Sequence, residues 1–530
     1  MPYYKSLREF IGVLERNGKL VRVTRPIMKE TELMPLVRLQ FRGLPEEARK
    51  GFLFENVTSV TGKKYDASVA VACLSASREM YALGLMCEVE KIAEKWAEGL
   101  LNPIKPVLVR SGPCQEEEHA GSELASEGLD ELPVPVNTPG FSGVLRTTAS
   151  HVITKDIEAG VQNCGCYQGH FLDRNIIGLG IAPTHHGAIH WRKYKERGLP
   201  MPLAIVIGVP PNVAYTSVTT LPYGTDEIAA AGGLAGEPVE MVKCRTIDLE
   251  VPAQAEIVIE GEVSTKERVG CFAFGEYTGY MYIGGARENY LMRVTAITHR
   301  RKPIYSVIHS QMPPSESSKM VQVGMEGAYF KHLRYDCNIP GILEVAFPES
   351  GGGRMWCVIR TKKRNPSEVW QALSAANAVA PGNAKIIIVV DEDIDPKDPD
   401  SVNWALTFRM QPHRDIHVMR GRSGGLDYSA YRPGSSDEEA RYPEGRGASS
   451  LLIDATLKWP YPPTSLPKKE YMDGALKIWN ELGLEPVKLK VPWYGYNLGC
   501  WTKEDEENAE LIVSGKYREV GKKLLVKLGS

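Results

Sequence analysis

A chain of 530 residues is too long for a single hydrophobic core, so two to four domains are expected. Its 63 basic and 65 acidic residues nearly cancel and form no long basic run, which argues against nucleic acid and anionic membranes as partners. With 43% hydrophobic and 24% charged residues, the composition is that of an ordinary soluble globular protein.

The cysteines and the N-terminus indicate the compartment. The ten cysteines are scattered without a C-x-x-C pair, which in a large chain favours reduced thiols over a disulfide framework. The first ten residues lack the apolar run of a signal peptide, and the most apolar window, 201–209, is too short to cross a bilayer. These features predict a cytoplasmic, multidomain enzyme.

The first 130 residues are predicted to form an α/β domain. Ser6 and Glu9 make a capping box in front of a helix with one apolar face. Two further amphipathic helices and one buried strand are expected at 31–41, 89–101 and 67–73.

Residues 131–312 are predicted to form a β-rich domain. Runs with β character, separated by glycine and proline turns, occur at 151–154, 176–181, 203–209, 255–263 and 290–298. Few long helical patterns interrupt them. A compact or split β-barrel with inserted helices fits this pattern best.

The remaining chain is predicted to alternate again. A linker helix is expected within 313–340, followed by a third domain at 341–465. The five consecutive branched aliphatic residues within 385–390 are typical of a strand covered on both faces, so this domain is predicted to be α/β. Residues 466–530 are predicted to be a helical tail that packs on a neighbour or on another subunit. The fold class is therefore α+β multidomain.

The stretch 270–280 is the candidate around which a catalytic site is expected. Glu276 lies there between two glycines and among four aromatic residues, Phe272, Phe274, Tyr277 and Tyr280. Aromatic rings desolvate a carboxyl group and favour its protonated form, which suits a general acid. The alternative is a tight turn whose glutamate faces water, and local sequence alone favours that alternative.

Common nucleotide-dependent and hydrolytic motifs are missing from the sequence. It contains no G-x-x-x-x-G-K-[ST] phosphate loop and no G-x-G-x-x-G after a strand. It also contains no G-x-S-x-G elbow and no H-E-x-x-H motif.

Three polar residues are candidate metal ligands, although each has an ordinary alternative. Asn163 lies in a glycine-rich stretch, 160–170, that is either a hairpin or a loop wrapping a phosphate. His185 follows a strand and fits a surface loop, and Glu227 fits the start of a helix. One Asn, one His and one Glu would suit Mn²⁺ or Mg²⁺ carrying a phosphate, but their spacing alone does not group them.

Several ordered stretches resemble the UbiD family of decarboxylases, which use prenylated flavin mononucleotide (prenylated FMN). The firmest are 239–253, 256–261 and Phe-Gly-Glu-Tyr-Thr-Gly-Tyr at 274–280. Further along come 402–406, 412–415 and Leu-Ile-Asp-Ala-Thr-Leu-Lys-Trp-Pro at 452–460. The chain is identified as a member of this family over nearly its whole length.

The resemblance implies an N-terminal α/β domain, a flavin-binding split β-barrel and a C-terminal α/β oligomerisation domain. It implies that the flavin phosphate binds through a divalent metal, with a monovalent cation, K⁺ or Na⁺, beside it. It also implies a homo-oligomer, from dimer to hexamer, and a prenylflavin synthase that supplies the cofactor.

Carried over by position, the resemblance assigns the cofactor site. The divalent metal would be held by Asn163, His185 and Glu227. The monovalent cation would bind backbone oxygens near Cys164, Thr216, Ser217 and Thr219.

The catalytic positions depart from the family pattern of a Glu-Arg-Glu network over the flavin. The last Glu matches Glu276, whereas the first Glu falls on Cys271 and the Arg falls on Gln168. Loss of both charges avoids leaving one unpaired buried charge. With no Arg beside it, Glu276 is expected to keep its proton more easily, and Gln168, His170 or a distant substrate handle must orient the substrate.

These residues predict a reversible decarboxylase of an aromatic or heteroaromatic acid that releases CO₂. Glu276 would donate the proton, Gln168 and Cys271 would line the reacting face, and the flavin would act as the electron sink. A second carboxylate or a coenzyme A thioester, as in phthaloyl-CoA, is a candidate handle.

Two alternatives stay open. One is an enzyme of the carboxylase direction, or a subunit of an arene-carboxylating complex. The other is a flavin-binding protein with little activity of its own.

Overall fold

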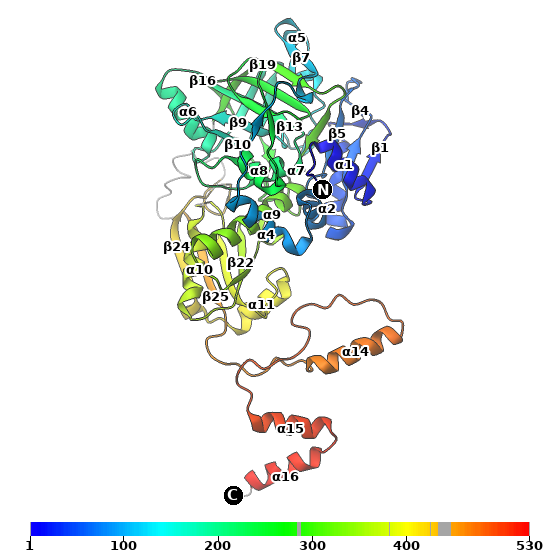
Figure 1. Cartoon of the computed structure of the whole chain (residues 1–530), viewed down its shortest axis with the longest axis vertical. Helices are drawn as coiled ribbons and strands as arrows, with labels where there is room; N and C mark the ends of the chain where they lie inside the picture. Colours follow the sequence, from blue (N-terminus) through cyan, green and yellow to red (C-terminus); the bar gives the residue numbers. More distant parts are fainter. Residues whose placement is uncertain (1, 284–287, 381, 425, 433–446, 529–530) are drawn as a thin grey trace.

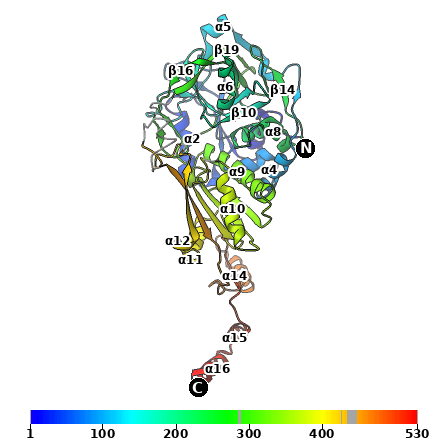
Figure 2. The same cartoon turned by 90° about the vertical axis from the view of Figure 1, so that its left-hand side faces the viewer.

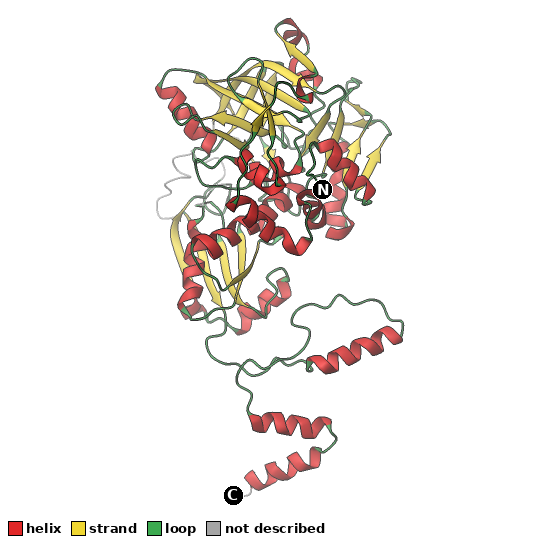
Figure 3. Cartoon of the chain, viewed as in Figure 1, coloured by secondary structure: helices red, strands yellow, loops and turns green. Residues whose placement is uncertain are grey.

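The computed structural model describes residues 2–283, 288–380, 382–424, 426–432 and 447–528. Residues 433–446, which fall within the predicted third domain, lie outside the described residues. In Figure 1 the N-terminal and β-rich parts form the upper body, the C-terminal sheet lies below them, and the last helices extend away. Figure 3 shows strands gathered in these bodies and helices alone in the extended part.

A four-stranded sheet with the order β1-β3-β5-β20 organises the first part of the chain. Ser6 caps the first helix by accepting a hydrogen bond from the Glu9 N–H, as the capping box predicts. The helices are α1 (Leu7–Arg16), α2 (Leu33–Gly43), α3 (Arg78–Leu85) and α4 (Ile92–Leu101). The strands are β1 (Leu20–Val23), β3 (Gly51–Phe54), β5 (Ser68–Val71) and β20 (Ile304–Val307).

The chain crosses twice between this sheet and the β-rich part. β20 comes from after the β-rich segment and pairs with β5. Conversely, β6 (Val107–Leu108) pairs with β14 (Glu240–Lys243), and β7 (Glu117–Ala120) pairs with β19 (Glu288–His299). The predicted boundary at residue 130 therefore falls after strands that already belong to the second part.

The β-rich part is built on one antiparallel sheet with the order β10-β9-β13-β16-β19-β12-β11-β8. Its further strands are β8 (Leu145–Arg146), β9 (His151–Lys155), β10 (Gln162–Cys166), β11 (Gln168–Asp173), β12 (Ile176–Gly180), β13 (Met201–Ile207) and β16 (Ile257–Gly270). Each predicted β-run overlaps one of these strands.

The sheet order and the chain connection together require this sheet to curl. β10 and β11 lie near opposite ends of the order, yet only Tyr167 separates them in sequence. Two residues of extended chain span at most about 7 Å, so the two ends of the sheet must come together there. The result is the curled half-barrel that a split barrel requires, and we call the junction at Tyr167 the seam.

Helices at the rim of this sheet carry several site residues. They are α6 (His186–Glu196), α7 (Pro211–Val218) and α8 (Glu227–Ala235). Asp226 caps α8 by accepting hydrogen bonds from the N–H groups of Ile228 and Ala229, which fixes Glu227 in the first turn.

The long helix α9 (Glu316–Lys331) leads to the third part, as predicted. Its core sheet has the order β21-β22-β23-β25-β24. The strands are β21 (Ile342–Ala346), β22 (Trp356–Thr361), β23 (Ile386–Asp391), β24 (Ile416–Arg422) and β25 (Ala448–Ala455), with helices α10 (Ser367–Ala378) and α11 (Pro399–Phe408). Ile387 and Val389 of β23 enter one apolar core while Ile388 and Val390 enter another, so the strand is covered on both faces.

The tail forms an arm that extends from the body, as Figure 2 shows from the side. It contains α14 (Lys469–Glu481), α15 (Lys503–Val513) and α16 (Tyr517–Leu528). The helices α15 and α16 are separated at Gly515, whose φ of +77° ends the first one. No residue of α14 or α15 is buried. Within the described part of the chain, no helix has the length and apolar character needed to cross a bilayer.

Candidate active site

The seam of the curled sheet gathers polar residues from three strands. Asn163 lies on β10, Gln168 and His170 lie on β11, and Arg146 lies on β8 opposite His170. The stretch 160–170, for which a hairpin and a phosphate loop were both open, therefore contains two strands at opposite ends of one sheet order. A side chain at Gly165 would meet the Tyr167 ring at 2.6 Å, so the seam closes around a glycine.

Glu276 lies in the turn of a short hairpin formed by β17 (Phe274–Gly275) and β18 (Met281–Tyr282). Its backbone N–H donates to the Tyr280 carbonyl at 3.2 Å, and the Gly279 N–H donates to the Glu276 carbonyl at 3.0 Å. Gly279 has a φ of +89°, which favours glycine. Glu276 is only 8% exposed, so the alternative of a glutamate facing water is wrong.

The four aromatic residues around Glu276 do not form the predicted apolar shell. Phe272 and Tyr280 are 52% and 68% exposed and face solvent. Tyr277 instead receives the Arg354 guanidinium over its ring at 4.5 Å, and Phe274 receives that of Arg146 at 4.3 Å. Two of the four rings therefore do not enclose Glu276, although the residue itself is buried.

The structure places an arginine beside Glu276, which contradicts the expectation that none is present. Arg146 is 3% exposed, and its Nη1 lies 3.5 Å from Oε1 of Glu276. Its Nη2 donates to the Gly275 carbonyl at 3.0 Å, while its Nε is buried without a hydrogen-bond partner. Burial lowers the pKa of the Arg146 guanidinium, and the Glu276 carboxylate opposes that shift.

Sequence reasoning missed Arg146 because it examined only the family position, residue 168. The signal would have been the pairing of β8 with β11, which sets Arg146 opposite His170, two residues from Gln168. The strand β8 has only two residues, too few for an alternating pattern to predict.

The other predicted catalytic residues lie around this pair. Gln168 is half-buried, with its Cα opposite Gly180 in the β11–β12 pairing. The half-buried thiol of Cys271 interacts electrostatically with Arg146. His170 packs edge-on against Phe274 at 5.3 Å. Burial, aided by Arg146, lowers the pKa of His170 to about 4, so its ring is neutral at physiological pH.

Two of the three predicted metal ligands lie together. The backbone N–H of Cys164, next to Asn163, donates to Oε2 of Glu227 at 2.9 Å. Nδ1 of His186 lies 2.9 Å from Oδ1 of Asn163 and 3.6 Å from Oε1 of Glu227. The imidazole that lies next to both Asn163 and Glu227 is thus that of His186, whereas the predicted ligand was its neighbour His185.

His185 is connected to this group through Tyr167. Its ring stacks on Tyr167 at 5.4 Å, and the Tyr167 hydroxyl lies 3.4 Å from the Asn163 amide nitrogen. Burial lowers the pKa of His185 to about 4, with Arg354 and His186 adding to the shift. A neutral imidazole at this position is competent as a metal ligand.

The donor set fits a hard cation. Asn163 and Glu227 are both buried, and together they present an amide oxygen and a carboxylate next to two imidazoles. Such a set suits a small divalent metal that carries a phosphate. The buried residues Thr216, Ser217 and Thr219, expected at the monovalent site, lie at the end of α7, which packs against β10.

The third domain contributes Arg354 and Tyr428 to the surroundings of the Glu276 hairpin. Arg354 precedes β22 and lies over Tyr277, and its Nε is buried without a hydrogen-bond partner. The Tyr428 hydroxyl donates to the Met281 carbonyl at 3.2 Å and accepts from the Ile283 N–H at 3.0 Å. The Glu276 hairpin is therefore held from both domains.

Two family models match the chain. Residues 105–313 match the 3-octaprenyl-4-hydroxybenzoate carboxy-lyase Rift-related domain, and residues 318–455 match the C-terminal domain of the same enzymes. An uncharacterised protein of Archaeoglobus fulgidus is 31% identical over 86% of this chain and 92% of its own length. One of Aquifex aeolicus is 30% identical over 91% of this chain and 99% of its own.

Solved structures are similar over most of the chain. The UbiD-class enzyme HmfF from Pelotomaculum thermopropionicum, in an evolved dimeric form with prenylated FMN, aligns with a TM-score of 0.75 and 29% identity, covering 88% of this chain and 98% of its own. Vanillic acid decarboxylase of Sedimentibacter hydroxybenzoicus aligns with a TM-score of 0.76 and 26% identity, covering 91% and 100%.

Proposed function

Because this chain belongs to the UbiD family of prenylated-FMN-dependent carboxy-lyases, we propose that it decarboxylates a free aromatic or heteroaromatic acid, with Glu276 as the proton donor and Arg146 as the carboxylate-binding group. The observation that carries the proposal is the buried contact of Arg146 with Glu276 over Phe274. The same residues act in reverse when CO₂ is added.

Arg146 has the donors that a carboxylate needs. Its guanidinium uses Nη1 and Nη2 in the contacts with Glu276 and Gly275, while Nε is buried without a partner. A buried donor without a partner costs free energy, and a bound carboxylate would satisfy it. Arginine binds carboxylates through two parallel hydrogen bonds, which also fixes the direction of the scissile bond.

Substrate binding prepares Glu276 for proton transfer. A substrate carboxylate at Arg146 brings a second negative charge next to Glu276, and like charges favour protonation of one of the two groups. When bound, prenylated FMN supplies the electron sink for the carbon that loses CO₂. As the C–C bond breaks and CO₂ leaves, Glu276 gives its proton to that carbon and then regains one from solvent.

The charge balance favours a free acid over a thioester. The argument for a coenzyme A handle rested on a site without arginine, whereas Arg146 provides the positive charge locally. Gln168 and Cys271 are neutral residues, so we propose that they shape the reacting face and leave the carboxylate to Arg146. An aryl-CoA acid such as phthaloyl-CoA remains the contrasting substrate for a test.

Asn163, Glu227 and a histidine at the start of α6, His185 or His186, would hold Mn²⁺ or Mg²⁺ on the flavin phosphate. Carbonyl groups near Cys164 and Thr216 would hold K⁺ or Na⁺ beside it. We propose this arrangement because the buried carboxylate of Glu227 and the amide oxygen of Asn163 both lie near the His186 ring, a set that a cation stabilises.

The test is turnover by protein produced with a prenylflavin synthase and handled under nitrogen. CO₂ release is measured in D₂O from a panel of benzoate-type and heteroaromatic acids and from coenzyme A monothioesters of aromatic dicarboxylic acids, such as phthaloyl-CoA, which keep one carboxylate. We expect turnover of free acids, with deuterium at the carbon that carried CO₂, and loss of that incorporation in Glu276→Gln by about 10²- to 10⁴-fold.

Two results would contradict the proposal. Turnover of the monothioesters alone would mean that the substrate must be held through its coenzyme A moiety and that a free acid at Arg146 is not the substrate. Full activity of Glu276→Gln would mean that the proton comes from another group. The matched control is Glu267→Gln, which removes an exposed carboxylate paired with Arg293 and should leave turnover unchanged.

A further inference from the structure

A cluster of two histidines and one glutamate lies outside the flavin site, at the top of the body in Figure 1 near β7. His119 lies on β7, His299 ends β19, and Glu131 ends a short helical turn, Gly128–Glu131. In the β7–β19 pairing, His119 is opposite Ile297. Side chains two positions apart on a strand share a face, so His299 lies on the same face as His119.

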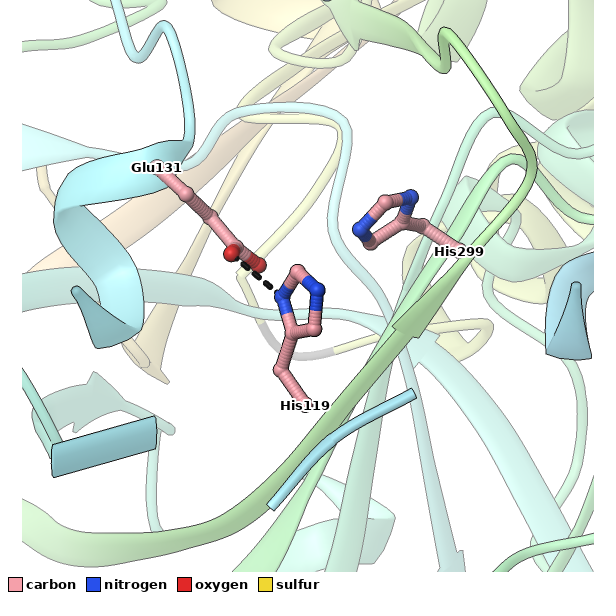
Figure 4. Close-up of side chains that lie close together, drawn as sticks. All are labelled: His119, Glu131 and His299. Atoms are coloured by element: carbon pink, nitrogen blue, oxygen red, sulfur yellow. Dashed lines mark hydrogen bonds and ion pairs between the residues drawn. The ribbon is translucent and has the colours of Figure 1, made fainter. Parts of the chain in front are cut away.

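The three side chains converge on one space, as Figure 4 shows. Each offers one potential ligand atom, and these atoms lie within 4.8 Å of one another. Nδ1 of His119 is 2.6 Å from Oε2 of Glu131, and the two imidazole rings meet edge to face at 5.1 Å. Among the described residues, no other group of three His, Cys, Asp or Glu side chains meets this criterion.

Two further contacts prepare the cluster for a cation. Nδ1 of His299 lies 2.7 Å from the Arg300 carbonyl, so Nδ1 carries the hydrogen and Nε2 keeps its lone pair. Metal-bound histidines commonly make this hydrogen bond to a backbone carbonyl. The second oxygen of Glu131, Oε1, is buried and has no hydrogen-bond partner. A buried carboxylate oxygen without a donor is costly, and a cation would compensate for it.

We propose that His119, Glu131 and His299 bind a divalent transition metal, for which Zn²⁺ fits the ligands, at a site separate from the cation of the flavin phosphate. Two imidazoles and one carboxylate are borderline donors that suit Zn²⁺, with solvent in the fourth position. This differs from the oxygen-biased set of Asn163 and Glu227.

Binding requires one small adjustment. Ligands about 2.0–2.1 Å from a tetrahedral ion lie about 3.3 Å apart, so His119 and Glu131 must separate from their present 2.6 Å. Both side chains are half-buried rather than enclosed, which leaves room for that movement. The ion would fasten the segment that carries β7 and Glu131 to the end of β19, a strand of the curled sheet.

The experiment uses the full chain in a Glu227→Gln background, which weakens the cation site of the flavin. After removal of metals with a chelator, the protein is titrated with Co²⁺. We expect about one equivalent of Co²⁺ with the visible bands of four-coordinate cobalt, displaced by Zn²⁺, and a Zn²⁺-dependent rise in melting temperature.

The decisive variant is His299→Phe, which keeps a ring and the His119–Glu131 contact but removes a ligand. It should lose the cobalt bands and the zinc-dependent stabilisation, while its melting temperature in chelator stays close to that of the parent. Glu131→Gln should also weaken Co²⁺ binding, and His417→Phe, at an exposed position on β24, should leave it unchanged. Unchanged bands in His299→Phe, or absence of bands in the parent, would overturn the proposal.

Discussion

Arg146 and Glu276 are 130 residues apart in sequence and share one buried contact. In the family pattern the arginine belongs at position 168, on β11, where this chain has glutamine. Here the positive charge comes from β8, the strand paired with β11. We propose that Arg146 supplies from the neighbouring strand the guanidinium that the family resemblance would place at position 168.

This relocation predicts a rescue experiment. Arg146→Gln should lower kcat/KM by about 10²-fold or more, since it removes the group that binds the carboxylate and leaves Glu276 without its partner. Gln168→Arg in that background should restore part of the loss, because it returns a guanidinium to the neighbouring strand. Steady-state kinetics on the preferred acid measure both effects.

Gln168→Arg alone is the control for this exchange. It adds a second positive charge beside Arg146 and should lower activity rather than raise it. If Arg146→Gln is fully active, or if Gln168→Arg rescues nothing while the protein still binds flavin, the two positions do not share a role.

At the scale of elements, the α9–α4 contact depends on the absence of a side chain. Gly327 of α9 packs against the buried Trp96 of α4, and an added Cβ would lie 2.5 Å from the Trp96 Cβ. Helix propensity alone favours alanine over glycine within a helix by about 0.5–1 kcal/mol. Packing therefore opposes propensity at this position.

We expect Gly327→Ala to lower the free energy of unfolding by about 1–3 kcal/mol, because neither helix backbone can move away without disturbing its neighbours. Gly474→Ala, in α14, is the matched control, since nothing lies within 4 Å of its added Cβ. That change should leave stability unchanged or slightly higher. Chemical denaturation of both variants gives the comparison, and equal stabilities would show that α9 and α4 adjust freely.

Helices and strands could be predicted from the sequence where a local pattern, such as an apolar run or a capping box, is enough to specify them. The apolar run within 385–390 predicted the doubly covered strand β23, and the pair Ser6 and Glu9 predicted the start of α1. Arg146 was not predictable, because its role comes from strand pairing across a curled sheet. The exposure of Phe272 and Tyr280 was not predictable either, since a hairpin sends neighbouring rings to different sides. The choice between His185 and His186 depends on how α6 begins, which sequence spacing does not fix.

At the scale of the whole molecule, buried histidines tie stability to pH. Burial lowers the pKa of His151 and that of His309 from 6.5 to about 3. Between these values the unfolded chain binds more protons than the folded one, so stability is complete above about pH 6.5 and falls as the pH drops towards 3. Each histidine contributes up to about 1.4 kcal/mol per pH unit in this range.

We therefore expect the melting temperature to fall steeply between pH 6.5 and 4. His309→Phe should flatten this dependence, because phenylalanine keeps the stacking on Phe41, now at 4.9 Å, without a titrating group. Melting curves at several pH values measure the slope for both proteins. The exposed His417→Phe is the control, and an unchanged slope in His309→Phe would contradict the assignment.

The C-terminal arm, which contains α14, α15 and α16, is the second feature that concerns the whole molecule. It carries exposed apolar side chains, among them Ile478, Leu482 and Val513. The packing of this arm on another subunit remains a prediction, and the exposed faces of α14 and α15 agree with it.

The seam at Tyr167 sets an order of events during synthesis. Asn163 and Gln168 emerge from the ribosome together, yet β10 is attached to the sheet through β9 and β13, and β11 through β12 and β19. The last of these strands ends at residue 299, so the two ends of the sheet can meet only after that point has been made. Contacts of this sequence separation form late. We therefore expect the proposed flavin site at the seam to form only after the whole sheet has been made.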